Sequence, residues 1–356
     1  MKTDGERARS GRRLYLDVLR AWACISVIVI HVCAYYAQVD VNGIDFLVGN
    51  ALNSVARAAV PLFVMISGAL TLDEQYRFTG EKLRRSIKNR ALFFAIWSSL
   101  YALVFHVAAP LVKGEAVSVQ RVFESLLSGH HHLWFIPMLI GLSLILPLLR
   151  LWVKRENKKY VEYFLMLSLI FASVVPFVTE KLCDLFPAAS CIYGLTDNLH
   201  LQYVAGFTGY YVLGWYLHNF PPKRRSVWYA AGVLGLLLTF GGTQIFSRLM
   251  DESKNFYSVF ATGIVGYSAA LFVLAKSLFE GREYSRGILC RFVRIVCDHS
   301  MGVYAIHAAI VQVLFTILGV GSAAVMIPLV TFVSFAVSLV ATQVLRRIPF
   351  AREYMV

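Results

Sequence analysis

Charged residues are scarce in this 356-residue chain. Asp, Glu, Lys and Arg make up 15% of it, whereas about 25% is usual for a soluble domain. Six scattered cysteines are too few for a disulfide framework. Only Cys183 and Cys191 share one loop, where they would pair in an oxidising compartment and otherwise remain two free thiols. The chain also lacks a P-loop, a glycine-rich dinucleotide motif and an internal repeat, which excludes the architectures that these motifs identify.

Apolar residues, by contrast, make up 58% of the chain and recur in stretches long enough to cross a membrane. This pattern predicts an all-α integral membrane protein with about ten transmembrane helices. The first apolar stretch is too long for a signal peptide, so we expect a retained anchor. The predicted spans form one domain, 15–347, between a mobile segment, 1–14, and a short tail, 348–356. They are 15–36, 44–72, 89–111, 130–151, 160–180, 200–219, 226–249, 256–278, 299–319 and 323–345.

The basic residues alternate with the predicted spans. If the N-terminus is cytoplasmic, the inner connections and their helix ends hold 28 of the 34 lysines and arginines. The positive-inside rule requires this distribution. The net charge of +13 is therefore explained by topology rather than by nucleic-acid binding. We expect both termini to be cytoplasmic.

The first span carries Asp17, Arg20 and His31 within an apolar run. An ionisable residue inside a membrane costs several kcal/mol unless it faces protein or water. On a helix, Arg20 and His31 differ in direction by about 20°, and Asp17 lies about 40° to the other side of His31. The rise from Arg20 to His31 is roughly 16 Å, which places the histidine near mid-membrane. This face is expected to line a wet or reactive site.

The second span, 44–72, places Asn53 and Arg57 four residues apart and hence on one helical face. An arginine at this depth needs a partner or a cavity. A structural pair with an acid or a carbonyl and a contact with a ligand both remain open. Pro61 and Gly68 would let the helix bend or unwind locally.

The cytoplasmic connection after the second span is rich in bases. Such bases commonly attract anionic lipid, but they would equally hold a phosphorylated ligand. The bases are Lys82, Arg84, Arg85, Lys88 and Arg90.

Three adjacent histidines, 130–132, precede Leu133 and Trp134 at the fourth span. Neighbouring residues on a helix diverge by about 100°, so the sequence favours no metal site here. A histidine and a tryptophan at a membrane interface more often act as anchors or substrate contacts. Spans five to eight carry few ionisable groups and are expected to be scaffold.

The ninth span places Ser300, Tyr304 and His307 on one helical face. His307 lies part-way into the bilayer and could meet the first span, whereas Asp17 is too far along its own helix to touch His31. Two chemistries then compete. In one, a buried histidine is the base for an acceptor hydroxyl while cytoplasmic cations hold a phosphorylated donor. In the other, the same residues move a proton, ion or solute through a carrier. The third possibility is that the histidine has a structural role only and forms its hydrogen bonds with neighbouring helices.

Four blocks in order resemble the membrane-bound acyltransferase family 3, and most closely its branch that contains the O-acetyltransferase of enterobacterial common antigen. The blocks are LDVLRAW…VIHV, NSVARAAVPLFVMISGAL, HLWFIPMLIG and SMGVYAIH. Together they extend over most of the chain.

The resemblance implies an O-acetyltransferase of the bacterial inner membrane. Acetyl-CoA would bind from the cytoplasm and its acetyl group would pass to a hydroxyl of an envelope glycan or lipid-linked sugar outside. An exporter or carrier of a polysaccharide precursor is the alternative. His31 would be the base or a transient acyl carrier, with Asp17 and Arg20 polarising the donor. The implied phosphate-binding residues are Arg85 and Lys88, and the implied substrate contacts are Asn53, Arg57, His132, Trp134, Tyr304 and His307.

Overall fold

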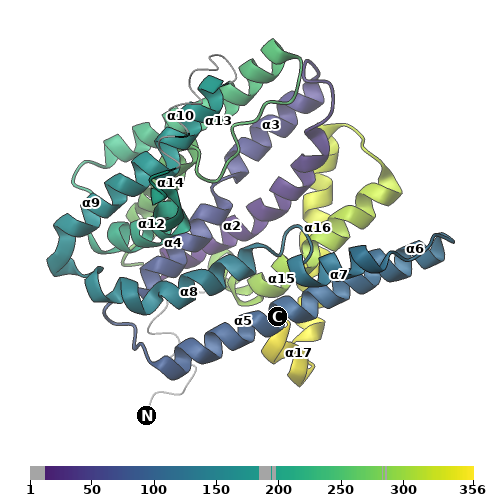
Figure 1. Ribbon diagram of the computed structural model, residues 1–356, viewed down its shortest axis with the longest axis horizontal. Coiled ribbons are helices and arrows are strands. Elements are labelled where there is room, and N and C mark those ends of the chain that lie inside the picture. Colours follow the sequence, from purple (N-terminus) through teal and green to yellow (C-terminus); the bar gives the residue numbers. More distant parts are fainter. Residues whose placement is uncertain (1–12, 184–193, 195–197, 283, 285–286) are drawn as a thin grey trace.

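The computed structural model describes residues 13–183, 194, 198–282, 284 and 287–356 (Figure 1). The expected mobile segment up to residue 12, and Cys191 of the cysteine pair, lie outside these residues. The described part is helical and contains no β-strand. Its helices are α2 Leu14–Cys33, α3 Ile44–Ala56, α4 Ala59–Thr71, α5 Gly80–Ala102, α6 Ala109–Val112, α7 Val119–Ser128, α8 Phe135–Trp152, α9 Lys158–Leu169, α10 Val175–Cys183, α12 Leu201–Asn219, α13 Arg225–Met250, α14 Thr262–Phe279, α15 Ile288–Leu318, α16 Ala323–Leu345 and α17 Pro349–Tyr354.

Within the described residues, nine helical segments are long and apolar enough to cross a membrane. They confirm the predicted all-α membrane protein. The sixth predicted span is also a helix, α12, but it is not among the nine. Its tyrosines and glycines lower its hydropathy, and it packs closely against α4 inside the bundle.

Helix α2 lies at the centre of the molecule and contacts α3, α4, α14, α15 and α16 (Figure 1). Two apolar clusters meet on it. Leu16 and Leu19 belong to the cluster that includes α4 and α12, whereas Ile28 and Val32 belong to the cluster with α15 and α16. Because α2 is covered on several sides, its ionisable residues face protein rather than lipid.

The second predicted span is two helices, α3 and α4, which meet at Arg57 and Ala58. Pro61 accounts for this position, because a proline removes the hydrogen bond to the carbonyl four residues earlier and its ring crowds that carbonyl. Gly68 does not bend α4. A Cβ atom there would lie 1.8 Å from the carbonyl oxygen of Tyr211, so this glycine allows α12 to approach the backbone of α4.

The eighth predicted span begins later than expected, because residues 251–261 re-enter the bundle as irregular chain. The segment is held along α13 by Ser247, which contacts both backbone groups of Lys254, and by Thr243, which accepts from the Phe256 N–H at 3.0 Å. Helix α14 then starts beside Gly235, about 22 Å before the end of α13. Irregular backbone at this depth is tolerated where it is buried in protein or lines a cavity.

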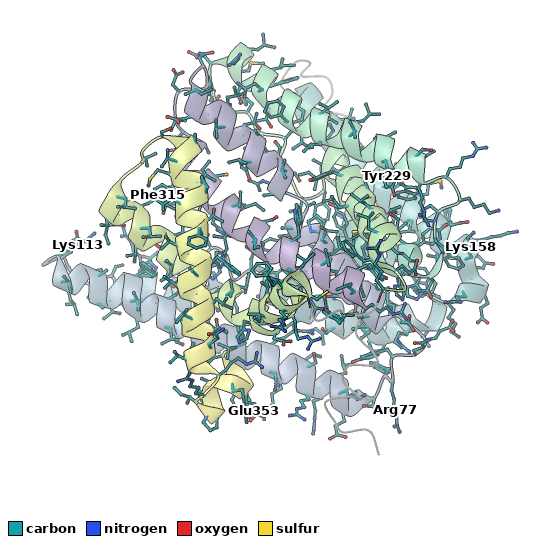
Figure 2. The ribbon with its side chains drawn as sticks, turned by 180° about the vertical axis from the view of Figure 1, so that it is seen from behind. Arg77, Lys113, Lys158, Tyr229, Phe315 and Glu353 are labelled. Atoms are coloured by element: carbon teal, nitrogen blue, oxygen red, sulfur yellow. The ribbon has the colours of Figure 1, made fainter. Side chains whose placement is uncertain are left out.

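Helix α5 continues through a π-helical stretch, Leu103–Ala108, into α6, and the short helix α7 packs back against α5. Neither the full length of this helix nor α7 was predicted. Figure 2 shows Arg77, just before α5, and Glu353, in α17, at the same edge of the molecule. This is consistent with a shared cytoplasmic side for the basic connection 77–90 and the C-terminal tail, which remains a prediction.

Candidate functional site

His31 and His307 form a hydrogen-bonded pair between α2 and α15. His31 Nδ1 lies 2.8 Å from the Val27 carbonyl oxygen and 3.3 Å from His307 Nε2. Since a carbonyl only accepts, His31 carries its proton on Nδ1. His307 likewise donates from Nδ1 to the Val303 carbonyl at 3.1 Å, so its Nε2 is an acceptor that shares the single His31 Nδ1–H with the closer Val27 carbonyl. The lone pair of His31 is therefore on Nε2, and the predicted meeting of these two histidines is confirmed.

The loop between α7 and α8 brings three more imidazoles to this pair. The ring centroids of His131 and His132 lie 5.5 and 6.2 Å from that of His31, and His132 lies 5.4 Å from His307. The prediction that residues 130–132 diverge as on a helix is wrong, because they form a turn. Their ligand atoms lie within 4.8 Å of one another. The geometric argument against a metal at this loop therefore does not hold.

The loop histidines lie in surroundings that favour their uncharged form. Burial lowers the pKa of His130 to about 3 and holds the pKa of His132 well below its usual value, because an apolar environment disfavours the charged ring. His130 Nδ1 and His132 Nδ1 also pair with each other at 2.9 Å. The loop thus supplies neutral polar groups beside His31.

Tyr304 joins this cluster, whereas Trp134 does not. The Tyr304 hydroxyl donates to the His132 carbonyl, and the two rings lie 5.5 Å apart. Trp134 is exposed and packs against Phe135 and Phe207. The substrate contacts implied for His132, Tyr304 and His307 are therefore gathered around His31, and the contact implied for Trp134 is not.

Asp17 and Arg20 lie near the other end of α2. Asp17 is 5% exposed and accepts from the Tyr284 hydroxyl, and its carboxylate lies 3.8 Å from the Arg20 guanidinium. Arg20 lines a cavity of about 160 Å³ and Asp17 does not. Asp17 therefore orients Arg20 rather than facing that space.

This cavity, here called the inner cavity, lies between α5, α8 and the end of α4. Its three cations are Arg20, Lys82 and Arg90, and Arg90 donates to the Ser143 hydroxyl. Its other lining residues are Ser67, Leu70, Thr71, Tyr76, Phe78, Leu83, Ser86, Leu139, Leu142, Ser143, Leu146 and Tyr211. His31 is not among them, so the inner cavity ends before it reaches the paired histidines.

Arg85 and Lys88, the implied phosphate-binding residues, do not line the inner cavity. Both are exposed, and the Arg85 guanidinium lies 4.0 Å from the carboxylate of Glu353. The helical spacing of Lys82, Ser86 and Arg90, four residues apart, places these three on the cavity face instead. Because Arg84 and Lys88 have the same spacing, the sequence alone does not show which face of the helix borders the cavity.

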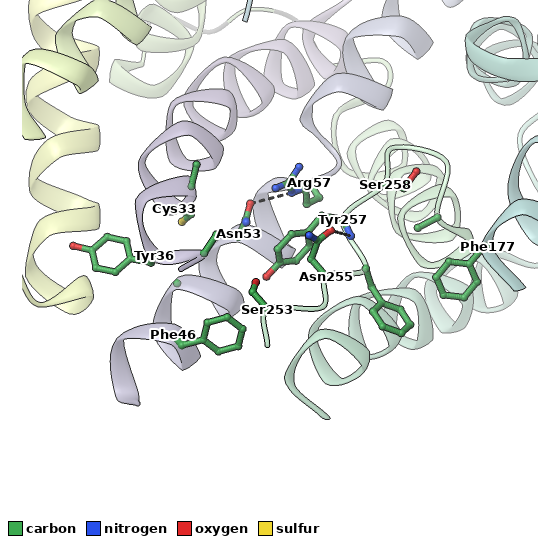
Figure 3. Close-up of a pocket in the computed structure, with 15 residues that line it drawn as sticks. Cys33, Tyr36, Phe46, Asn53, Arg57, Phe177, Ser253, Asn255, Tyr257 and Ser258 are labelled. Carbon is green, nitrogen blue, oxygen red and sulfur yellow. Dashed lines mark hydrogen bonds between the residues drawn. The ribbon is translucent and has the colours of Figure 1, made fainter. Parts of the chain in front are cut away.

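A second cavity of about 410 Å³, here called the outer pocket, lies beyond His31 along α2. Figure 3 shows Arg57, Asn53 and Tyr257 gathered within it. Arg57 Nε donates to Asn53 Oδ1 at 3.0 Å, and the guanidinium lies 4.5 Å from the centre of the Tyr257 ring. Asn53 and Arg57 thus share one face as predicted, but the partner of Arg57 is an amide rather than the acid or carbonyl that was considered. Burial raises the pKa of Tyr257 to about 12, so its hydroxyl remains protonated and donates to Asn50.

A buried polar cluster that the sequence analysis missed joins α2, α12 and α14. His218 Nε2 lies 3.2 Å from the carboxylate of Asp73, and the Tyr15 hydroxyl contacts the other ring nitrogen. Lys276 donates to the His218 carbonyl at 2.6 Å. The predicted scaffold spans therefore do carry ionisable groups, which tie the beginning of α2 to its neighbours.

Comparison with known proteins gives one result. A family model described as an acyltransferase domain matches residues 13–345. No curated protein and no solved structure matches the chain.

Proposed function

The chain belongs to the acyltransferase family that this model defines, and from that premise we propose an O-acetyltransferase of the bacterial inner membrane. It would move acetyl from cytoplasmic acetyl-CoA to a hydroxyl of a cell-envelope glycan or related acceptor on the outer side. The observation that carries the proposal is the position of His31 on α2, between the inner cavity beside Arg20 and the outer pocket beside Cys33.

The inner cavity is suited to the donor. Three cations around a narrow space neutralise phosphates efficiently, and pantetheine is a long, thin arm. Phosphates bound near Lys82 and Arg90 would leave the thioester pointing along α2 toward His31. Because the cavity lining ends at Arg20, the packed residues between Arg20 and His31 must separate for the thioester to pass.

The tautomer of His31 determines which of its two nitrogens can act as the base. Its Nε2 takes the proton of the acceptor hydroxyl, and the oxygen attacks the carbonyl carbon of the thioester. The tetrahedral intermediate collapses as the carbon–sulfur bond breaks, and the leaving thiolate takes the proton back from Nε2. Acceptor hydroxyl and acetyl-CoA thus become acetyl ester and free CoA. The Val27 carbonyl and His307 Nε2 share the His31 Nδ1–H throughout, which holds the ring in place and stabilises its transient positive charge.

The test is acetyl transfer by the full-length protein in nanodiscs. Labelled acetyl-CoA is supplied with a bacterial membrane extract, and labelled acetyl esters are identified by mass spectrometry. We expect ester formation by the wild type and none by His31→Gln that gives the same gel-filtration profile. Export of a polysaccharide precursor without any acetyl transfer would instead support the carrier alternative.

A further inference from the structure

Arg57 presents a positive charge that no acid in the described part of the chain neutralises. Its polar contacts there are the amide of Asn53 and the ring of Tyr257. Neither neutralises a charge. The side chain is half-buried beside the break between α3 and α4, inside a segment of membrane-spanning length. A cation at this depth is expensive unless it meets a counter-ion or a cavity.

The lining of the outer pocket consists of hydrogen-bond donors and apolar groups. Among its described residues none is acidic, and Arg57 is its single cation. The polar side chains beside it are Tyr36, Asn53, Ser253, Asn255, Tyr257 and Ser258. The hydroxyls of Tyr36 and Tyr257 already donate to Gly321 and Asn50, and the serine and asparagine side chains are of types that can donate a hydrogen bond to a ligand. Such a set is complementary to an oxygen-rich anion.

The acids near this pocket lie at its outer rim. Asp40, Asp251 and Glu252 line a separate shallow cavity that shares only Ala37 and Ser253 with the outer pocket. All three are exposed, and Glu252 lies 3.3 Å from the Lys254 ammonium. The groups that act electrostatically on Arg57 are Tyr257 and Cys33, and none of these three acids is among them. The rim therefore does not supply the counter-ion of Arg57.

We propose that the outer pocket binds an acceptor carrying an oxyanion, a carboxylate or a phosphate, and that Arg57 is the residue that binds it. This rests on the proposed acetyl transfer and names the class of its acceptor. Asn53 fixes the Nε edge of the guanidinium and Tyr257 covers one of its faces, so the two terminal nitrogens are left to form a two-pronged contact with an anion.

Matched sugar probes test the proposal in nanodiscs that hold the full-length protein. Methyl glucuronide is compared with methyl glucoside, and glucose 1-phosphate with glucose, as inhibitors of acetyl transfer to a membrane extract. Each pair differs only in its anionic group. We expect the anionic member to inhibit about tenfold or more strongly, as suits a hydrogen bond to a charged group. The stronger of the two anions identifies whether a carboxylate or a phosphate is bound.

Variants then assign the effect to Arg57. Arg57→Gln should abolish the preference for the anionic probe, Arg57→Lys should keep part of it, and the rim control Lys254→Gln should leave it unchanged. If Arg57→Gln does not fold, the wild type and Arg57→Lys decide. Equal inhibition by both members of each pair, or inhibition by neither, overturns the anion site. His31-dependent hydrolysis of acetyl-CoA in water, measured in the same samples, shows separately whether the acetyl-transfer proposal stands.

Discussion

The inner cavity and the outer pocket adjoin the same helix but differ in charge, size and construction. The inner cavity is about 160 Å³, has three cations and is lined chiefly by regular helices. The outer pocket is about 410 Å³, has one cation and is walled partly by the irregular segment 251–261. A narrow, strongly basic space suits a phosphate-bearing donor with a thin reactive arm. A wider space of donors and aromatic rings suits a bulkier acceptor. His31 lies between them on α2.

Removal of His31, which lies between the two cavities, should lower the rate of acetyl transfer more than any other change. For His31→Ala we expect acetyl transfer to fall to background, because the variant lacks the nitrogen that is proposed to take the proton of the acceptor. Acetyl-CoA binding, measured by equilibrium dialysis, should persist because its cations are elsewhere. Retention of full transfer in this variant would separate His31 from the chemistry.

His307 should have the next largest effect, through the orientation of His31. For His307→Leu we expect kcat to fall by about ten- to a hundredfold, the range found when a partner of a functional imidazole is lost. KM for acetyl-CoA should change little. His307→Gln retains an acceptor and should recover part of kcat. Equal losses in both variants, with an unchanged pH profile, would indicate a purely structural role.

The inner cavity itself is tested by charge reversal. Lys82→Glu combined with Arg90→Glu should raise KM for acetyl-CoA by about tenfold or more, because the charge-assisted contacts with phosphate are lost. The matched control is Arg85→Glu with Lys88→Glu on the exposed side of α5, which should leave KM nearly unchanged. The opposite result would return the phosphate site to the residues that the family resemblance implied.

A substitution in the loop that holds residues 130–132 should have the smallest effect. It should change the stability of the protein and not its rate of acetyl transfer. Since burial lowers the pKa of His130 to about 3, the ring stays neutral in the folded protein while it gains a proton in the unfolded chain below pH 6.5. Its contribution to stability is therefore complete above pH 6.5 and lost progressively as the pH falls toward 3. Thermal unfolding of His130→Asn should depend less on pH between 7 and 4.5 than that of the wild type. An identical pH dependence would contradict this.

Helical periodicity correctly predicted which residues lie close together wherever those residues are on regular helices. The position of Asn53 and Arg57 on one face follows from a four-residue spacing, and the meeting of His31 with His307 follows from two polar faces at similar depth. Pro61 likewise accounts for the break in the second span. These inferences needed only the geometry of one helix and the cost of burying a polar group.

The failures have a common physical cause, which is backbone that leaves the helix. Residues 130–132 converge because they form a turn, and no periodicity describes a turn. The sequence predicts a loop and the start of a helix for residues 251–261. Their stabilising partners, Thr243 and Ser247, become visible only once α13 is placed beside them. The choice of Arg85 and Lys88 had a different origin. It followed the resemblance to a family pattern, and only the packing of the helix places Lys82 and Arg90 at the inner cavity.

The irregular wall of the outer pocket also bears on how such a protein can diversify. An insertion in a packed transmembrane helix turns every later residue by about 100° about the helix axis and so disrupts its contacts with neighbouring helices. Residues 253–258, in contrast, are irregular. Apart from the buried ring of Phe256 and the contact of Tyr257 with Asn50, they are attached through side-chain hydrogen bonds to α13, so their length or composition can change while α13 and α14 keep their own contacts. Related chains could therefore accept differently shaped molecules by varying this short stretch, while the histidine pair and the basic cavity stay the same.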